Sequence, residues 1–332
     1  MREDIQISKR RGRGYEYMKN KERWTISDIP SQKGRLILVT GTGGLGYITA
    51  LILVRAGAEV ILAGRNRSKG EAAVKEIQSN VVSANIHFEQ LDLGDLASIE
   101  ASVKRICDKY PRLDVLINNA GVIMSQQRQV TKDGFELQFG TNYLGHFALT
   151  AHLMPLLRKG HNPRVVNVCA LAANSAVINF DDLQAEHLYK PMPVYGQSKL
   201  ANLIFSLELH RRSMAEEWGV MSIAVHPGLS RSDLVDNGTR EKSKMPLALR
   251  LIGPIMIQSA EQGALPTIFA ATSPEAVSGQ YYGPDGVKET RGFPAPAKIP
   301  ATAKDVNTAI RLWEISKQLT NLDFERILSG IS

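Results

Sequence analysis

One stretch decides the fold: Arg35-Leu36-Ile37-Leu38-Val39-Thr40-Gly41-Thr42-Gly43-Gly44-Leu45-Gly46. Its first part, Arg35–Thr40, is a short apolar run of the kind that forms a buried strand. The glycines follow directly, and Tyr47–Leu51 has the pattern of a helix. Glycine lets the backbone turn sharply, and the N–H groups and dipole of a helix start favour negative charge. The stretch therefore predicts a phosphate-binding turn between a strand and a helix.

The glycine spacing makes this prediction more specific. Gly41, Gly43 and Gly46 satisfy GxGxxG, which is weak evidence alone but strong evidence between a strand and a helix. We therefore expect a dinucleotide cofactor to contact Gly41, Gly43, Gly44, Leu45 and Gly46. The alternative is a glycine-rich turn with a purely structural role.

The end of the next strand indicates which dinucleotide is bound. The run Glu59–Ala63 is followed by Gly64-Arg65-Asn66, where an NAD-selective site usually has an acidic residue for the ribose 2′-hydroxyl. A guanidinium can instead bind a 2′-phosphate through two hydrogen bonds. Arg65 therefore favours NADP(H), although a solvated surface charge is the alternative.

Short apolar runs alternate with longer amphipathic stretches from Gly34 onward, as in parallel strands joined by helices. The other expected strands are His87–Gln90, Val115–Asn118, Arg164–Val168 and Ser222–His226. The pattern predicts an α/β fold: one Rossmann-type domain with a doubly wound parallel sheet and helices on both faces. We place this domain at residues 34–290, after a flexible basic extension at 1–33. Residues 291–332 should form a Pro-containing segment and a helix, about Ala303–Leu319, packed on the domain.

Charge and composition exclude several classes of protein. The 332 residues carry a net charge of +7, and residues 1–35 hold ten Lys or Arg against five Asp or Glu. Such an arm could touch nucleic acid or an acidic membrane, but a solvated, disordered extension is the interpretation that we favour, and we expect no nucleic-acid partner. No apolar stretch approaches the roughly 20 residues of a transmembrane helix. Cys107 and Cys169 lack metal-ligand spacing, so we expect no metal and a cytoplasmic location.

Further motifs follow in one order: Leu91-Asp92-Leu93, Asn118-Asn119-Ala120-Gly121, Gly140-Thr141-Asn142-Tyr143-Leu144-Gly145, Tyr195-Gly196-Gln197-Ser198-Lys199 and Pro227-Gly228. Together they resemble the short-chain dehydrogenase/reductase family over about residues 34–290. Gly64-Arg65-Asn66 and the long insertion Ile178–Pro193 are similar to its retinol-dehydrogenase-like and protochlorophyllide-reductase-like branch. YxxxK alone is poor evidence, because it also occurs at Tyr15 and Tyr17.

The pair Tyr195 and Lys199 suits acid–base chemistry. Residues four apart on a helix share a face and can act on one bound molecule. A tyrosine with an ordinary pKa of about 10 exchanges a proton near neutral pH more readily when a positive charge stabilises its phenolate. The resemblance implies that Lys199 also holds the nicotinamide ribose. It further implies that Asn142 anchors a water in a proton relay; the alternative for Asn142 is a polar residue that bends a helix.

The resemblance also supplies further cofactor contacts. Asp92 matches the residue that meets adenine through its neighbouring backbone, here at Leu93. Asn118 to Gly121 match the segment beside the adenosine and the central sheet. The full set of expected contacts beyond the glycine turn is Arg65, Asp92, Leu93, Asn119, Ala120, Gly121, Tyr195, Lys199, Pro227, Gly228 and Ser232.

The sequence departs from the family pattern at the serine that steadies the substrate oxygen. Cys169-Ala170 stands where this branch has two serines, and Ala170 falls on the catalytic one. Losing one preorganised donor to an oxyanion can cost about 10²–10³ in rate. Cys169 is a weak donor and should point elsewhere, and Ser175 could replace the serine only in a rebuilt loop. The glycine turn is also one residue shorter than TGxxxGxG, and Ser232 replaces a threonine.

Three functions fit these residues. The first is NADP(H)-dependent interconversion of a carbonyl and an alcohol on an apolar small molecule, with Tyr195, Lys199 and Asn142 as catalytic residues. The second is a catalytically weakened NADP-binding sensor or scaffold, which Ala170 and the short turn favour. The third is a double-bond reductase or isomerase on the same fold. The substrate should lie over the nicotinamide, walled by the apolar segment Leu229–Gly263. This segment is either an amphipathic covering helix, an apolar substrate lid, or both.

The quaternary state follows only by analogy. Relatives pair through two long helices, here about Gly134–Arg158 and Gly196–Arg212, which suggests a homodimer or homotetramer.

Overall fold

One sheet organises the molecule in the computed structural model, which describes residues 23–123, 127–230 and 258–330. Among these residues the sheet has eight strands in the order β3-β2-β1-β4-β5-β6-β7-β8. All neighbouring pairs are parallel except β7 and β8. The chain order reverses between β1 and β4, which is where doubly wound α/β proteins bind their ligands. The predicted single-domain α/β fold is therefore confirmed.

The expected strands are found with shifts of one residue at some ends: β1 Leu36–Thr40, β2 Glu59–Gly64, β3 Ile86–Gln90, β4 Val115–Asn118, β5 Arg164–Val168 and β6 Met221–Val225. Two further strands were not predicted: β7, Tyr281–Pro284, and β8, Pro294–Pro296. Their proline content argues against strands, but β8 is an edge strand, where proline is tolerated. The sheet thus continues past residue 290, and the expected domain boundary there falls inside it.

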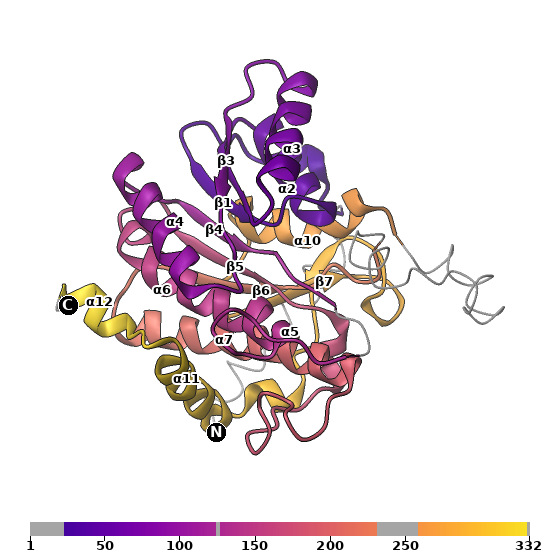
Figure 1. Ribbon diagram of the computed structural model, residues 1–332. Coiled ribbons are helices and arrows are strands. Elements are labelled where there is room, and N and C mark those ends of the chain that lie inside the picture. Colours follow the sequence, from indigo (N-terminus) through magenta and orange to yellow (C-terminus); the bar gives the residue numbers. More distant parts are fainter. Residues whose placement is uncertain (1–22, 124–126, 231–257, 331–332) are drawn as a thin grey trace, which may run out of the picture.

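Two helical layers cover the sheet (Figure 1). One face carries α2 Gly44–Arg55, α3 Arg67–Asn80 and α10 Ala260–Thr272. The other carries α4 Leu96–Lys109, α6 Gly145–Leu157 and α7 Pro191–Ala215. The side chains of β1 alternate between the two layers, because successive residues of a strand point to opposite faces. Shorter elements are η1 Ile26–Asp28, α5 Leu137–Phe139, the π-helical turn η2 Gly140–Leu144, η3 Leu171–Ser175, η5 Val287–Glu289 and η6 Ala301–Lys304.

The two C-terminal helices, α11 Val306–Thr320 and α12 Phe324–Ser329, pack outside α6 and α7 (Figure 1). Their contact is aromatic: Trp313 lies 5.2 Å from Phe147 of α6 and 5.8 Å from Phe205 of α7, between ring centroids. Phe324 lies 5.2 Å from Phe147. The chain's own C-terminal helices thus occupy the face through which α6 and α7 were expected to pair with a second subunit, so the structure gives that analogy no support.

The segment from Arg23 to Lys33 packs on the domain, so the extension expected at residues 1–33 ends earlier than predicted. Trp24 meets Phe269 of α10 edge to face, with ring centroids 5.3 Å apart. Gln32 is buried, and its backbone N–H donates to the carbonyl of Ala56 at 2.8 Å. These contacts attach the segment to the α2 and α10 layer.

Several expectations concern residues outside the described part of the chain. Ser232 and most of the expected substrate cover, Leu229–Gly263, are among them. Within the described residues, no helix combines the length and the apolar character needed to cross a membrane. The same residues contain no group of three His, Cys, Asp or Glu that could hold a metal ion.

Candidate active site

The glycine turn connects β1 to α2, as the sequence predicts, but the helix already begins at Gly44 rather than after Gly46. Gly41 has φ of +99° and Gly44 has φ of +50°, both of which favour glycine. A Cβ on Gly46 would lie 2.1 Å from the carbonyl oxygen of Gly41, so only glycine fits this approach. The shortened turn is therefore a closely packed structure.

The start of α2 suits an anion. Gly43 is the N-cap residue and offers no capping side chain, so no side chain occupies the first N–H groups of the helix. A helix start with these free groups and its dipole attracts phosphate. The turn thus fits the pyrophosphate of a dinucleotide, with Gly43, Gly44 and Leu45 presenting the backbone.

Thr40 joins the turn to the end of β4. Its hydroxyl oxygen accepts hydrogen bonds from the backbone N–H groups of Asn119 and Ala120, both at 2.9 Å. The Asn119 side-chain amide donates to the Thr40 carbonyl at 2.8 Å. The two segments expected to contact the cofactor are therefore one hydrogen-bonded unit at the point where the strand order reverses.

Arg65 and Asp92 line one open hollow of about 420 Å³ at the ends of β2 and β3. Arg65 is exposed, and within residues 23–123, 127–230 and 258–330 its guanidinium has no hydrogen-bond or ion-pair partner. Asp92 is engaged locally, because its carboxylate accepts from the backbone N–H of Gly94 at 2.9 Å. The hollow therefore leaves one uncommitted cation where an adenosine phosphate was expected.

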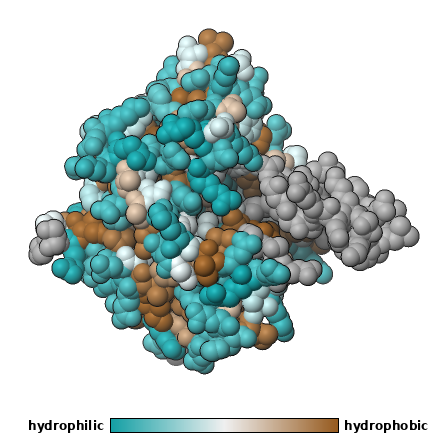
Figure 2. Space-filling model, in the orientation of Figure 1, coloured by the Kyte–Doolittle hydropathy of each residue, from teal (hydrophilic) through white to brown (hydrophobic). Residues whose placement is uncertain are grey.

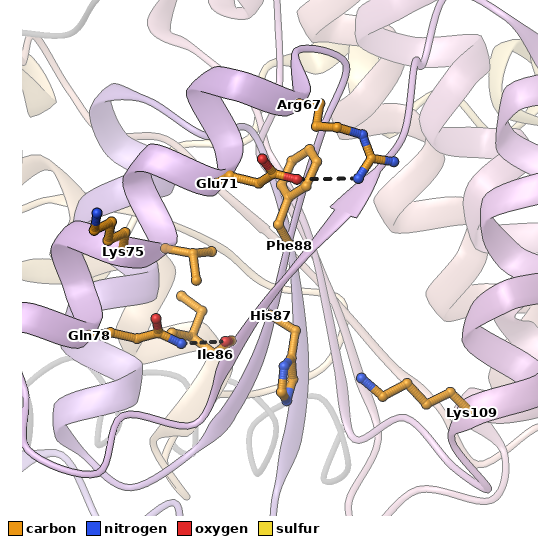
Figure 3. Close-up of a pocket in the computed structure, with 9 residues that line it drawn as sticks. Arg67, Glu71, Lys75, Gln78, Ile86, His87, Phe88 and Lys109 are labelled. Atoms are coloured by element: carbon orange, nitrogen blue, oxygen red, sulfur yellow. Dashed lines mark hydrogen bonds and ion pairs between the residues drawn. The ribbon is translucent and has the colours of Figure 1, made fainter.

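A neighbouring hollow of about 410 Å³ lies at the outer edge of the sheet, between α3, β3 and α4 (Figure 3). Arg67 lines both hollows, but Glu71 accepts from its guanidinium at 3.2 Å, as the dashed line in Figure 3 shows. Gln90 accepts from the same guanidinium at 3.1 Å. This edge hollow contains none of the predicted site residues, and Arg67 is already committed.

Asn142 lies in the π-helical turn before α6, and its side chain makes three hydrogen bonds. Its Oδ1 accepts from the backbone N–H of Val122 at 2.7 Å. Its Nδ2 donates to the Val122 carbonyl at 3.1 Å and to the Ser198 hydroxyl at 3.0 Å. Ser198 in turn donates to the Tyr195 carbonyl at 2.8 Å. Asn142 thus ties the end of β4 to α7; Ser198 was not predicted.

Lys199 lies buried one helical turn after Tyr195. Its ammonium group donates to the carbonyl of Val168, the last residue of β5, at 3.0 Å. A Cβ on Gly121 would be 3.3 Å from the Lys199 Nζ and 3.2 Å from Asn142 Oδ1, so the glycine keeps this corner open. Burial lowers the pKa of Lys199 to about 8.

Tyr195 is in the first turns of α7, which begins at Pro191, earlier than the helical pattern indicated. The Lys199 Nζ lies 6.0 Å from the centre of the Tyr195 ring. Burial raises the pKa of Tyr195 above its ordinary value. Its hydroxyl has no hydrogen-bond partner in the described part of the chain. The neutral phenol is therefore the resting form, and its proton is available.

The loop after β5 carries Ala170 at the position where the family resemblance implies a serine. Ala170 precedes η3, and a Cβ on Gly196 would be 3.1 Å from the Ala172 carbonyl, so this loop packs directly beside Tyr195. The Cys169 thiol is buried and directed to the Asn167 carbonyl at 3.6 Å. Ser175, at the end of η3, is exposed.

The Pro227–Gly228 turn is held by residues that the sequence analysis did not identify. Gln258 donates to the Pro227 carbonyl at 2.6 Å. The buried His226 accepts from the Gly228 N–H at 3.2 Å, and its other ring nitrogen lies 3.1 Å from Glu289. The hydrogen bond between His226 and Glu289 lowers the pKa of the Glu289 carboxyl. Nothing local in the sequence signals this pair, because the two residues are 63 positions apart.

The fold and these residues together are those of an oxidoreductase with a doubly wound α/β domain. The model of the short chain dehydrogenase family matches residues 35–243. Human retinol dehydrogenase 13 is 38% identical over 295 residues, covering 87% of this chain and 86% of its own. Human polyprenol dehydrogenase is 40% identical over 263 residues, covering 76% and 78%.

Among solved structures, an uncharacterized protein from Mycobacterium paratuberculosis is similar with a TM-score of 0.74 and 38% identity. The match covers 91% of this chain and 99% of that one. The chain belongs to the short-chain dehydrogenase/reductase family, in its retinol-dehydrogenase-like branch.

Proposed function

We propose that the protein is an NADP(H)-dependent oxidoreductase that interconverts a carbonyl and an alcohol on an apolar small molecule. The observation that carries the proposal is the buried corner of Lys199, Gly121 and Asn142 beside the unpartnered Tyr195 hydroxyl. A catalytically weakened binding protein is the second candidate, because Ala170 provides no donor for the substrate oxygen.

In this proposal each residue has one task. NADP(H), when bound, supplies or accepts the hydride. Tyr195 donates its phenolic proton to the carbonyl oxygen, or removes a proton from the alcohol in the reverse direction. Lys199 provides the positive charge that stabilises the phenolate left after the donation. Asn142 keeps the end of β4 and the start of α7 in register, so that these groups face one another.

Exposed apolar residues that precede Tyr195 in the chain support the proposal that the substrate is apolar. Val177, Leu188 and Met192 are among the exposed large apolar side chains, and all three lie in the segment that leads to Tyr195. The visible surface in Figure 2 is mostly hydrophilic, with apolar patches in the lower half of the view.

The first test is a titration of the purified protein with NADPH and NADH, followed by nicotinamide fluorescence. A panel of apolar ketones is then added to the complex. Selective NADPH binding and subsequent cofactor oxidation are the expected results. Binding without turnover would favour the second candidate, and binding of neither nucleotide would refute both.

Replacing Arg65 with alanine should weaken NADPH binding about 10-fold to 100-fold, because a charge-assisted hydrogen bond is worth about 1.5–3 kcal/mol. NADH lacks the 2′-phosphate, so its dissociation constant should not change. Lys75→Ala is the control, since Lys75 lines only the edge hollow and not the hollow that contains Arg65. Equal losses for both nucleotides in Arg65→Ala would contradict 2′-phosphate recognition.

Burial lowers the pKa of Lys199 to about 8. The rate of carbonyl reduction should therefore fall as the pH rises through this value. Lys199 is charged below this pH and neutral above it, and only the charged form stabilises the Tyr195 phenolate. The measurement is kcat/KM between pH 6 and 10, where we expect a decline approaching about tenfold per pH unit. Lys199→Gln should be much slower and should lose this decline. A rate that increased through pH 8 would show that the neutral amine is the active form.

A further inference from the structure

A buried histidine contacts two residues of the site, and the proposed mechanism does not use it. His146 is the second residue of α6 and is fully inaccessible to solvent. Both of its contacts are residues of the site. Its Nε2 lies 2.9 Å from the Thr40 hydroxyl, and its Nδ1 lies 2.9 Å from the main-chain carbonyl of Asn142.

The contacts determine where the ring hydrogen lies. The Asn142 carbonyl can only accept, so Nδ1 must be the donor. The Thr40 oxygen already accepts from the N–H groups of Asn119 and Ala120, so its own hydrogen is donated. Two acceptors lie within reach of this hydrogen, His146 Nε2 at 2.9 Å and the Ile117 carbonyl at 3.3 Å, and Nε2 is the closer. With Nδ1 protonated in a neutral ring, Nε2 has a lone pair that accepts this hydrogen. The hydrogen bonds then run in one direction, from Thr40 through His146 to Asn142.

The surroundings keep the ring neutral. Burial and, to a smaller extent, the charge of Lys199 on α7 outweigh the hydrogen bond to the Asn142 carbonyl and lower the pKa of His146 to about 3. Thr40 on β1 and Asn142 in the π-helical turn, its hydrogen-bond partners, carry no charge. The ring therefore keeps a single hydrogen, and the direction of the chain is fixed, throughout the pH range in which the protein would work.

We propose that His146 is a positioning residue that couples the cofactor turn to the Asn142 carbonyl through a neutral Nδ1–H tautomer. This inference rests on the proposed function for its catalytic consequence, but not for the tautomer itself. Thr40 organises the glycine turn and the Asn119–Ala120 backbone, whereas Asn142 organises Val122 and α7. The His146 side chain forms hydrogen bonds to both of these units and so links them.

The link has a physical reason in the geometry of the π-helical turn. Gly140–Leu144 departs from α-helical bonding, so the direction of the Asn142 carbonyl depends on what holds it. The His146 ring, held by Thr40 at Nε2, presents its Nδ1–H as a rigid donor at one defined place. Movement of the cofactor turn would therefore be transmitted to the carbonyl of the residue that supports Lys199 and Tyr195.

The tautomer is tested by nitrogen NMR of protein labelled at histidine, with the His146 signals assigned by their loss in His146→Phe. We expect a protonated Nδ1, an unprotonated Nε2 and no titration between pH 5 and 9. A protonated Nε2 or a titration in this range would overturn the proposal. This readout needs no substrate and no bound cofactor, so it is independent of whether the proposed function holds.

The positioning role is tested by kinetics on three variants. His146→Phe removes both hydrogen bonds and should lower kcat on the order of 10-fold to 100-fold, as expected for misplaced catalytic groups, with little change in KM for the ketone. His146→Asn places an amide donor near the position of Nδ1 and should recover much of the loss. His152→Phe, in the same helix, is the control and should leave kcat unchanged.

The rescue separates positioning from simple core packing. If His146→Asn is as slow as His146→Phe, or if both lose only thermal stability, the positioning role is wrong. Should His146→Phe fail to fold, Thr40→Val and Thr40→Ser provide the same comparison from the other end of the chain of hydrogen bonds. Equal kcat in these two variants would also overturn the proposal. If the parent protein binds no cofactor, the proposed function fails, while the NMR result still decides the tautomer.

Discussion

Replacing Ala170 with serine should raise kcat for carbonyl reduction about 10²–10³-fold, which is the typical value of one preorganised donor to a developing oxyanion. The loop that carries residue 170 packs against Gly196, the residue that follows Tyr195 in α7. Residue 170 has extended backbone with φ of −155° and ψ of 161°, which serine adopts without strain. A serine there would add the donor without rebuilding the loop.

The measurement must separate catalysis from local stabilisation. Ala170 is the N-cap residue of η3 and makes no capping hydrogen bond, whereas serine is a preferred N-cap. A serine that only capped η3 would raise the melting temperature and leave kcat unchanged. Single-turnover rates with bound NADPH and the thermal transition of the same sample therefore distinguish the two outcomes.

Cys169→Ser is the matched control for this experiment. It introduces the same hydroxyl one residue earlier, where the present thiol is directed to the Asn167 carbonyl. We expect no gain in kcat from this variant. A gain in Cys169→Ser comparable to that in Ala170→Ser would show that the hydroxyl works through the loop and not at the substrate oxygen. No gain in either variant would mean that the protein has compensated for the serine in another way.

The central sheet could be predicted because its signals are local. The apolar runs of β1 to β6 and the glycines after β1 each predict structure within a few residues of themselves. The strands β7 and β8 could not be predicted in this way, because four and three residues with several prolines are too short for a periodic pattern. The strand β7 pairs with the free edge of β6, and β8 then pairs with β7 as the edge strand, where proline is tolerated.

The site shows the same division between local and long-range information. Tyr195, Lys199, Asn142 and the glycine turn carry recognisable spacings, and the structure places the side chains of Asn142 and Lys199 next to Gly121. Thr40 and His146 carry none, because their roles arise from contacts between segments 106 residues apart. The covering of α6 and α7 by the C-terminal helices was missed for a similar reason. An aromatic residue such as Trp313 indicates burial but not its partner.

Replacing Tyr195 with phenylalanine should lower kcat about 10²–10⁴-fold, the usual contribution of a positioned general acid. The substitution removes only the hydroxyl, which has no partner in the described part of the chain, and keeps the ring that packs at the start of α7. Folding should therefore be unaffected, and NADPH affinity should change little, because the turn before α2 and Arg65 are untouched.

The Tyr195→Phe experiment compares single-turnover hydride transfer and NADPH binding in the same preparation. Tyr189→Phe is the matched control: it removes a phenol hydroxyl that lies 3.4 Å from Gln138 and should leave the rate unchanged. Because burial keeps the Tyr195 phenol neutral, the parent enzyme has the donated proton in place before the substrate binds. In Tyr195→Phe that proton must come from water, so the residual rate should increase as the solution becomes more acidic. A variant that retained the parent rate would exclude Tyr195 as the acid and would make a buffer-independent donor, such as Lys199, the next group to replace.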